Sequence, residues 1–331
     1  MVGQAQTGTG KTAAFGLPLL HKIDHKKGTV QALILCPTRE LGKQIAKQLF
    51  RYTKYSDKIF TESVYGGEKI EIQIANLSRT THIVVATPGR LIDLVNRKVV
   101  DLSKVKTVIL DEADEMLSMG FKKQLNEILD CLTEVKCKWL FSATMPQGIK
   151  QIVNEHMSSN ALRITVSGSN VVNAKIDHKF LLCDDTEKFN ALLQFLNSVK
   201  GQRGIVFCRT RKMAKKVTAQ LIAKNITTDS IHGDLLQKER DKVMRAFKNK
   251  KLSIIVATDI AARGIDVAEL TFVVHFQLPD KDEYYTHRSG RTARAGKKGT
   301  SLVLANSYDV RTIRGYERKL NIYFSKVKVI K

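Results

Sequence analysis

Short apolar runs alternate with longer amphipathic segments along the chain. The runs are rich in β-branched residues and too short for helices, which is typical of buried parallel strands. The segments between them have the length and the periodicity of helices. In the first half the expected strands are residues 32–36, 59–65, 82–86, 107–110 and 138–141, and the clearest helices are residues 41–52 and 121–132.

A small polar stretch, SGSN at residues 167–170, follows the helix expected to end near His156 and has the composition of a loop. A second alternating series begins after it, so the pattern predicts an α/β fold with two tandem domains, each a mostly parallel sheet flanked by helices. We expect them at residues 1–166 and 176–331, joined by a linker at 167–175. The expected strands of the second half are residues 179–182, 204–208, 229–232, 253–257, 272–276 and 301–305.

Length and charge add to this picture. A chain of 331 residues exceeds the size at which one hydrophobic core keeps growing, which also favours two domains. The 55 Lys and Arg exceed the 32 Asp and Glu, and a net charge of +23 attracts polyanions such as nucleic acid. Generic basic solubility is the alternative reading. Residues 1–166 carry 23 basic and 16 acidic side chains and residues 167–331 carry 32 and 16, so the second half is the more basic.

The cysteines and the hydropathy exclude other classes of protein. Five cysteines are scattered without a CxxC pair or a His at zinc-ligand spacing, which predicts reduced, structural thiols. No apolar run approaches the roughly 20 residues of a membrane span, and the N-terminus lacks a signal-peptide pattern. We expect a cytoplasmic protein without a membrane partner.

A glycine-rich stretch near the N-terminus carries candidate phosphate chemistry. Residues 4–12 read QAQTGTGKT and match the phosphate-loop pattern GxxxxGK[ST], except that alanine holds the first glycine position. Gly8 and Gly10 permit a tight turn whose N–H groups point inward. Lys11 can reach the β- and γ-phosphates of a nucleotide, and Thr12 can hold Mg²⁺ at a helix N-terminus. Such a turn also serves as a packing device, but the GKT ending favours the nucleotide.

An acidic cluster follows one of the expected strands. Asp111-Glu112-Ala113-Asp114 comes directly after residues 107–110, at the carboxyl end of a buried strand where α/β proteins place ligands. The alternative is an acid-rich helix N-terminus. Together with the glycine-rich stretch, the cluster predicts phosphoryl transfer, with Asp111 holding Mg²⁺ and Glu112 orienting or deprotonating the attacking water.

These motifs and others resemble the DEAD-box RNA helicases in order and spacing, over essentially the whole chain. The resemblance implies two RecA-like domains, a helicase ATP-binding domain and a helicase C-terminal domain. The first half carries the matching motifs PTREL (37–41), Gly66-Gly67, TPGR (87–90) and SAT (142–144). The second half carries VFCRTR (206–211), Gln237 with Arg240, ATDIAARGID (257–266) and HRSGRTARAG (287–296).

The resemblance implies roles in ATP hydrolysis. Arg291 and Arg294 would be the arginine fingers, Asp266 would meet the ribose, and His287 would couple the γ-phosphate to the SAT motif through Ser142 and Thr144. An Arg cluster in one domain neutralises phosphate bound to the other only when the domains close, so hydrolysis would depend on closure. A solvated basic helix is the alternative. The catalytic set is Lys11, Glu112, His287, Arg291 and Arg294. The residues implied for ATP are Gln6, Thr7, Gly8, Thr9, Gly10, Lys11, Thr12, Asp111, Gly264, Asp266, Arg291 and Arg294, with Thr12 and Asp111 for Mg²⁺.

The resemblance also implies contacts with the sugar-phosphate backbone of RNA. Such contacts position a strand without reading its sequence. Aromatic residues are not interleaved with the matching loops, so base stacking is not indicated and the 2′-hydroxyl should matter more than sequence. The residues implied for RNA are Pro37, Thr38, Arg39, Gly66, Gly67, Thr87, Pro88, Gly89, Arg90, Arg209, Gly233, Thr258 and Arg263.

The chain departs from the family pattern at three places. Gly42 stands where alanine is usual and Ala293 where glycine is usual, and we expect each to change stability by about 1 kcal/mol or less. Only Met1 to Gln4 precede the phosphate loop, so the upstream aromatic and the Gln-containing motif that recognise adenine are not present, and Met1 would be an internal methionine of a longer product. We therefore expect weaker binding of adenine. We also expect a monomer that can associate through apolar surface of the first domain left uncovered by the missing segment.

The preferred function is an RNA-stimulated ATPase that clamps RNA between two lobes and locally unwinds short duplexes. An RNA-binding module with impaired ATP turnover is the second hypothesis, because the adenine-recognising segment is missing. A processive DNA translocase with the same two-lobe plan is the third, and the DEAD and HRSGRTAR spellings disfavour it.

Overall fold

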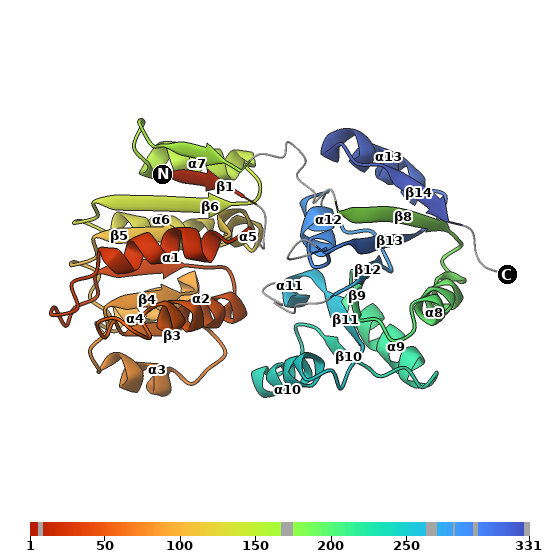
Figure 1. Ribbon diagram of the computed structural model, residues 1–331, viewed down its shortest axis with the longest axis horizontal. Helices are drawn as coiled ribbons and strands as arrows, with labels where there is room; N and C mark the ends of the chain where they lie inside the picture. The colour runs from red at the N-terminus through yellow and green to blue at the C-terminus, as the bar shows by residue number, and fades with distance from the viewer. Residues whose placement is uncertain (6–8, 167–174, 263–269, 281, 294–296, 328–331) are drawn as a thin grey trace. The chain divides into compact units, whose positions relative to one another are not determined.

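The computed structural model describes residues 1–5, 9–166, 175–262, 270–280, 282–293 and 297–327. The chain divides into two compact units, Met1–Ser167 and Gly168–Lys331, and Figure 1 shows that each is built around its own sheet. None of the helices within the described ranges is long and apolar enough to cross a membrane.

The first unit contains a seven-stranded sheet in the order β3-β4-β2-β5-β6-β1-β7, and every neighbouring pair is parallel. The central strands β2, β4 and β5 consist of aliphatic residues and a threonine and are buried along their whole length, as parallel strands covered on both faces require. The strands are β1 (Val2–Gln4), β2 (Ala32–Leu35), β3 (Thr61–Val64), β4 (Ile83–Ala86), β5 (Thr107–Leu110), β6 (Cys137–Ser142) and β7 (Arg163–Thr165).

Helices cover both faces of this sheet. Successive side chains of β2 point to opposite faces, so Ala32 and Ile34 pack in one apolar cluster while Leu33 and Leu35 pack in another. The first cluster lies under α1 (Lys11–His21) and α2 (Arg39–Tyr52), which share one face in Figure 1. The other face carries α3 (Ile70–Leu77), α4 (Pro88–Asn96), α5 (Ala113–Ser118), α6 (Lys122–Asp130) and α7 (Gln147–His156).

The second unit repeats this plan. Its sheet has the order β10-β11-β9-β12-β13-β8-β14, again with parallel neighbours, so each strand occupies the position of the first-unit strand whose number is seven lower. The strands are β8 (Ile176–Leu182), β9 (Gly204–Cys208), β10 (Thr228–Ile231), β11 (Ile254–Thr258), β12 (Phe272–His275), β13 (Gly299–Ala305) and β14 (Phe324–Val327). The expected fold, two tandem α/β domains with parallel sheets, is confirmed.

The helices of the second unit also lie on both faces. Residues of α8 (Lys188–Ser198) and α9 (Arg211–Ile222) pack on one face, and Figure 1 draws these two helices together. Apolar clusters on the other face contain residues of α10 (Gln237–Lys248), α11 (Asp259–Ala262), α12 (Asp282–Ser289) and α13 (Asp309–Leu320).

Parallel pairing gathers the functional motifs. All strands of a parallel sheet end at the same edge, and ligands of open α/β sheets bind outside those carboxyl ends. In the first unit the motifs expected to bind RNA follow β2, β3 and β4, which are neighbours, and those expected to bind phosphate follow β1, β5 and β6, which are also neighbours. One edge of the sheet is thus divided between two kinds of motif.

The two small-residue departures have different environments. A Cβ at Gly42, inside α2, would lie 3.3 Å from Cys36 Sγ, a tight contact that the glycine avoids. Ala293 is buried and holds φ 55°, in the left-handed region where an L-residue costs roughly 1–2 kcal/mol and glycine costs little. Ala293 therefore carries backbone strain, which the small difference in volume between glycine and alanine does not indicate.

Candidate functional site

The phosphate loop is described at its two ends. β1 leads into the loop, and α1 starts at Lys11 after Gly10, whose φ of 89° suits only glycine without strain. The amides of Ala13 and Ala14 donate to Gly10 O at 3.0 Å, which begins the helix. Lys11 is buried, and its Nζ donates to Ala5 O at 3.0 Å, so its charge lies beside the residue that follows β1. Gln6, Thr7 and Gly8 lie outside the described residues, whereas Thr9 is exposed and Thr12 half-buried.

Two buried carboxylates follow β5. Asp111 is 2% and Glu112 8% exposed. Burial, reinforced by the neighbouring Glu112 charge and opposed by Lys11, raises the pKa of Asp111 to about 6. Glu112 adopts a left-handed conformation, φ 50° and ψ 50°, and its N–H donates to Asp111 Oδ1 at 3.0 Å. Strained, desolvated acids of this kind gather at functional sites.

The two carboxylates differ in what they could bind. Glu112 Oε2 is buried and accepts no hydrogen bond from any residue that the structure describes. Across the described ranges, no group of three or more His, Cys, Asp or Glu could hold a metal by itself. Mg²⁺ commonly takes one or two protein carboxylates and completes its shell with substrate phosphates and water. Asp111, whose charge interacts with that of Lys11 in the first turn of α1, suits that arrangement.

A hydrogen-bond network joins the end of β5 to the end of β6. Asp114 Oδ2 accepts from Thr144 N at 2.9 Å and from Thr144 Oγ1 at 2.8 Å. Ser142 Oγ accepts from Asp114 N at 3.3 Å and donates to Thr144 O at 2.7 Å. The structure thus brings Ser142 and Thr144 together with the acidic cluster, and it gives Asp114 a contact that the sequence did not assign.

In the second unit, the arginine motif covers the last residues of α12 and the turn that follows. Arg291 is buried, and its Nε donates to His287 O at 3.2 Å. Arg288 is 2% exposed and forms a bidentate pair with Asp259, Nε to Oδ1 at 2.5 Å and NH2 to Oδ2 at 2.7 Å, while NH1 donates to Gln277 O at 2.7 Å. The pair with Asp259 fixes α12 against the end of β11, and the bond to Gln277 O fixes it against the end of β12. Gly264, Asp266 and Arg294 lie outside the described residues.

The sequence motifs did not predict the Arg288–Asp259 pair. Both residues stand inside recognised motifs, but neither spacing nor composition indicates that one pairs with the other. A buried bidentate pair needs both partners, since removal of one leaves an uncompensated charge.

The expected RNA residues of the first unit lie on three neighbouring strand ends. Thr38 Oγ1 accepts from Leu41 N at 3.3 Å and caps α2, and Pro37 precedes it. The Arg39 guanidinium lies 4.6 Å from the centre of the Tyr65 ring. The turn after β3 contains Gly66 and Gly67, the latter with φ 82°, and Thr87, Pro88, Gly89 and Arg90 begin α4 after β4.

Arg90 is held inward by a residue that the sequence did not single out. The Arg90 side chain is 11% exposed, and its NH1 donates to Gln73 Oε1 at 2.9 Å and its NH2 to Glu68 O at 3.0 Å. A signal for Gln73 existed: it lies on the apolar stripe of α3 with Ile70, Ile74 and Leu77, where a polar residue must find buried partners.

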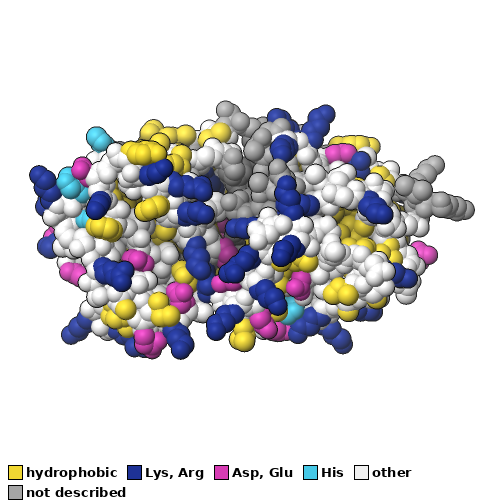
Figure 2. Space-filling model, turned by 60° about the horizontal axis from the view of Figure 1, so that its bottom comes forward, with side chains coloured by type: hydrophobic (Ala, Val, Ile, Leu, Met, Phe, Trp, Pro, Cys, Tyr) yellow, Lys and Arg dark blue, Asp and Glu magenta, His cyan; other side chains and the backbone are white. Residues whose placement is uncertain are grey.

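The expected RNA residues of the second unit also follow neighbouring strands. Arg209 comes after β9 and pairs with Asp280 at 2.5 Å, Gly233 comes after β10, and Thr258 ends β11. Arg263 lies outside the described residues. Figure 2 shows Lys and Arg side chains spread over both units on the visible face, with acidic side chains between them.

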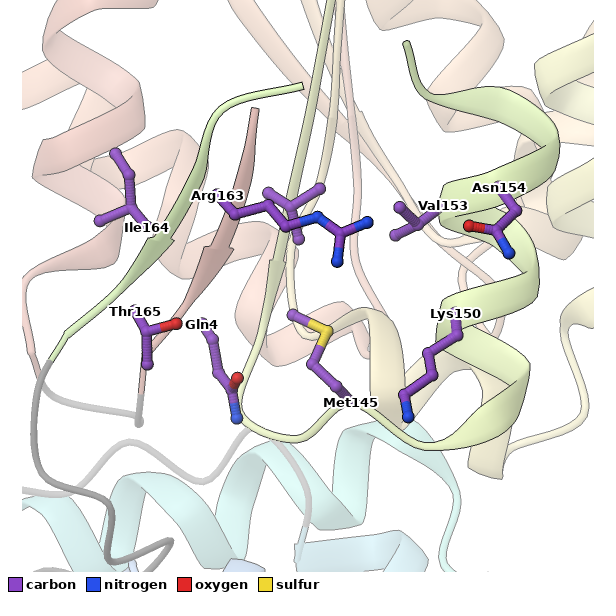
Figure 3. A pocket seen from close by; sticks show the side chains of 9 residues that line it. Gln4, Met145, Lys150, Val153, Asn154, Arg163, Ile164 and Thr165 are labelled. Atoms are coloured by element: carbon purple, nitrogen blue, oxygen red, sulfur yellow. The ribbon is translucent and has the colours of Figure 1, made fainter. Parts of the chain in front are cut away.

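A separate cavity of about 290 Å³ lies between α7 and strands β1 and β7. Figure 3 shows Arg163, Lys150 and Met145 around it, together with Gln4, whose Nε2 donates to Ala143 O at 3.3 Å. Its lining contains none of the residues expected to bind nucleotide or RNA. The cavity therefore adjoins the carboxyl ends of β1 and β7 without including the residues expected to bind nucleotide or RNA.

Known proteins resemble the chain throughout. A family model described as DEAD/DEAH box helicase matches residues 1–152, and one described as Helicase conserved C-terminal domain matches residues 187–296. The DEAD-box ATP-dependent RNA helicase CshA of Bacillus cereus is 41% identical over 318 residues, which cover 96% of this chain and 60% of that protein. The chain thus spans about 60% of the length of the curated relatives it matches.

Solved structures of DEAD-box proteins have the same fold as this chain. S. cerevisiae Dbp5 bound to RNA and ADP BeF3 is 28% identical, with a TM-score of 0.91, and the match covers 100% of this chain and 85% of Dbp5. A DEAD box protein from the hyperthermophile Methanococcus jannaschii is 40% identical, with a TM-score of 0.57, and the match covers 99% and 88% of the two chains. The two parallel sheets with the same strand order are therefore RecA-like domains of the helicase type. The chain belongs to the DEAD-box RNA helicase family, which confirms the resemblance.

Proposed function

We propose that the chain is an RNA-stimulated ATPase that clamps RNA between its two lobes and separates short duplexes locally. The observation that carries the proposal is the divided carboxyl edge of the first sheet, where three neighbouring strands end in basic and glycine-rich motifs and three others end in the phosphate loop, the acid pair and the SAT loop. The curated relatives, named ATP-dependent RNA helicases, and the RNA-bound Dbp5 structure support the same reading.

The buried charges support a division of chemical roles. Lys11 and the first turn of α1 bind the β- and γ-phosphates, because both present positive charge beside the loop. Asp111 and Thr12 hold Mg²⁺, which when bound neutralises charge on the phosphate oxygens. Glu112, desolvated and left with an unpartnered oxygen among the described residues, orients or deprotonates the attacking water.

The second unit completes the reaction in this proposal. Arg291, with Arg294, neutralises charge that develops on the transferred phosphoryl group, and this requires the lobes to close. The Asp259–Arg288 pair keeps α12 rigid, so that Arg291 is positioned without further ordering. RNA bound to both lobes favours the closed state, which links hydrolysis to RNA.

Phosphate release measured with and without RNA tests the proposal. The folded chain is incubated with ATP and Mg²⁺ and titrated with single-stranded oligo-U RNA, with duplex DNA as the control. We expect the rate to rise with RNA and to saturate. RNA binding without RNA-dependent phosphate release would identify an RNA-binding module, and equal stimulation by duplex DNA would identify a translocase.

A further inference from the structure

The side chain of Gln73 is the centre of a buried network beneath the expected RNA loops. Gln73 lies in α3 and is 2% exposed. Its Nε2 donates to Tyr65 O at 2.9 Å and to Glu68 Oε2 at 3.0 Å. Its Oε1 accepts from Tyr65 N at 3.3 Å and from Arg90 NH1 at 2.9 Å. The amide therefore uses both donors and both acceptor sites available to a glutamine.

These four bonds allow one orientation of the amide. If the oxygen and nitrogen exchanged places, the oxygen would face Tyr65 O and the Glu68 carboxylate, and the amide N–H groups would face the donors of Tyr65 and Arg90. Each of those contacts would be repulsive and buried, which is costly. The network consequently fixes both the backbone of Tyr65 and the direction of the Arg90 side chain.

The network spans all three RNA-side strand ends of the first unit. Tyr65 follows β3 and immediately precedes Gly66 and Gly67. The guanidinium of Arg39, which follows β2, lies over the Tyr65 ring. Arg90 comes from the loop after β4 and also donates to Glu68 O on the far side of the glycine turn. One neutral side chain thus braces the turn on both sides and binds Arg90 directly, while Arg39 contacts the ring of Tyr65, whose backbone Gln73 holds.

We propose that Gln73 is a positioning residue for RNA: it holds the Gly66-Gly67 turn and Arg90 in the conformation that contacts the sugar-phosphate backbone. Because Gln73 is buried, the proposed role is to position the loop and not to contact RNA directly. Ordering the loop before RNA arrives removes that ordering cost from binding. The inference rests on the proposed function and assigns a part of it to a residue outside the recognised motifs.

The variant Gln73→Leu keeps the size of the side chain and removes all four hydrogen bonds. We expect the KM for oligo-U RNA in the ATPase assay to rise about tenfold, because the loop must then be ordered on binding. kcat at saturating RNA and the hydrolysis rate without RNA should stay within about twofold. Amide exchange of residues 65–69 in the absence of RNA should accelerate about tenfold.

Gln31→Leu is the matched control. Gln31 is also a buried glutamine of the first unit that holds a loop, since it accepts from Asp24 N at 3.0 Å and donates to Asp24 O and Lys27 O at 2.8 and 3.2 Å. It precedes β2, at the end of the strand opposite to Arg39, so its loss should leave the KM for RNA unchanged.

A pair of variants separates positioning from packing. Gln73→Glu places a carboxylate against Glu68 and should also raise the KM for RNA, whereas adding Glu68→Gln restores a donor between the two side chains and should recover part of the loss. A folded Gln73→Leu protein with the parental KM, or one whose KM rises no more than that of Gln31→Leu, overturns the inference. If ATP hydrolysis by the parent protein does not depend on RNA, the proposed function fails. If, in addition, amide exchange of residues 65–69 is as slow in Gln73→Leu as in the parent, the positioning role is rejected as well.

Discussion

Acidification should destabilise the second unit through His178. This residue lies on β8, is 5% exposed, and its Nδ1 forms a 2.5 Å hydrogen bond with Tyr285 OH. The rings of Tyr285 and Phe324 lie 5.7 and 5.5 Å from the imidazole. Burial lowers the pKa of His178 from 6.5 to about 4, so the folded protein keeps it neutral at pH values where the unfolded chain binds a proton.

The size of the effect follows from the difference in pKa. The contribution of a neutral His178 is fully present above about pH 6.5 and is lost as the pH falls toward 4, because the unfolded state then binds the extra proton. A difference of about 2.5 units corresponds to roughly 3 kcal/mol, and about 2 kcal/mol of it should be lost near pH 5. His275 shifts in the same direction, since burial and the nearby Arg288 charge lower its pKa well below 6.5.

Pulse proteolysis in urea measures this loss, with fragments of the second unit identified by mass. The free energy of unfolding is compared near pH 7 and near pH 5 for the parent and for His178→Phe, which removes the titrating group and keeps a ring between Tyr285 and Phe324. We expect the parent to lose about 2 kcal/mol more than the variant. The same pH dependence in both proteins would refute the reasoning, since carboxylates common to both cancel in the difference.

Three other substitutions test the phosphate site. Lys11→Ala should weaken binding of a fluorescent ATP analogue by at least about tenfold, since it removes the buried cation at the start of α1, and unchanged affinity would argue against phosphate contact. Glu112→Gln should keep nucleotide affinity within about twofold and reduce phosphate release at least about 100-fold in single-turnover assays. Retained turnover would remove Glu112 from its proposed role. Thr144→Val removes the 2.8 Å hydroxyl bond to Asp114 and should lower the free energy of unfolding by about 1–2 kcal/mol in urea titrations, whereas an unchanged midpoint would show that the backbone bond suffices.

The sequence predicted the central strands of each sheet well because these strands are buried on both faces. Runs such as Ile83–Ala86 and Ile254–Thr258 have no polar face and stand between turn-forming residues, so their type and approximate bounds follow from composition. The edge strands Arg163–Thr165 and Phe324–Val327 were missed, because an exposed edge strand carries polar residues and gives no apolar run.

The sequence motifs named candidate site residues but not the residues that hold them in place. Lys11, Asp111 and Thr144 belong to short patterns whose chemistry can be read from neighbouring residues. Gln73 and the Arg288–Asp259 pair act through contacts between residues that are distant in sequence, and no local pattern records which partner each will meet. Such contacts are set by strand order and helix packing, which a single sequence states only indirectly.

The shared strand order has a further consequence for nucleotide binding. β8 and α8 occupy the places that β1 and α1 hold in the first unit, so the loop between β8 and α8 is the counterpart of the phosphate loop. That counterpart, residues 183–187, reads CDDTE: it has no glycine, it carries three acids, and Asp185 pairs with Lys188 at 2.7 Å. A loop of this charge repels a triphosphate. The two units are therefore unlike in charge at this position, and under the proposed function the loop after β1, not the loop after β8, would bind the nucleotide.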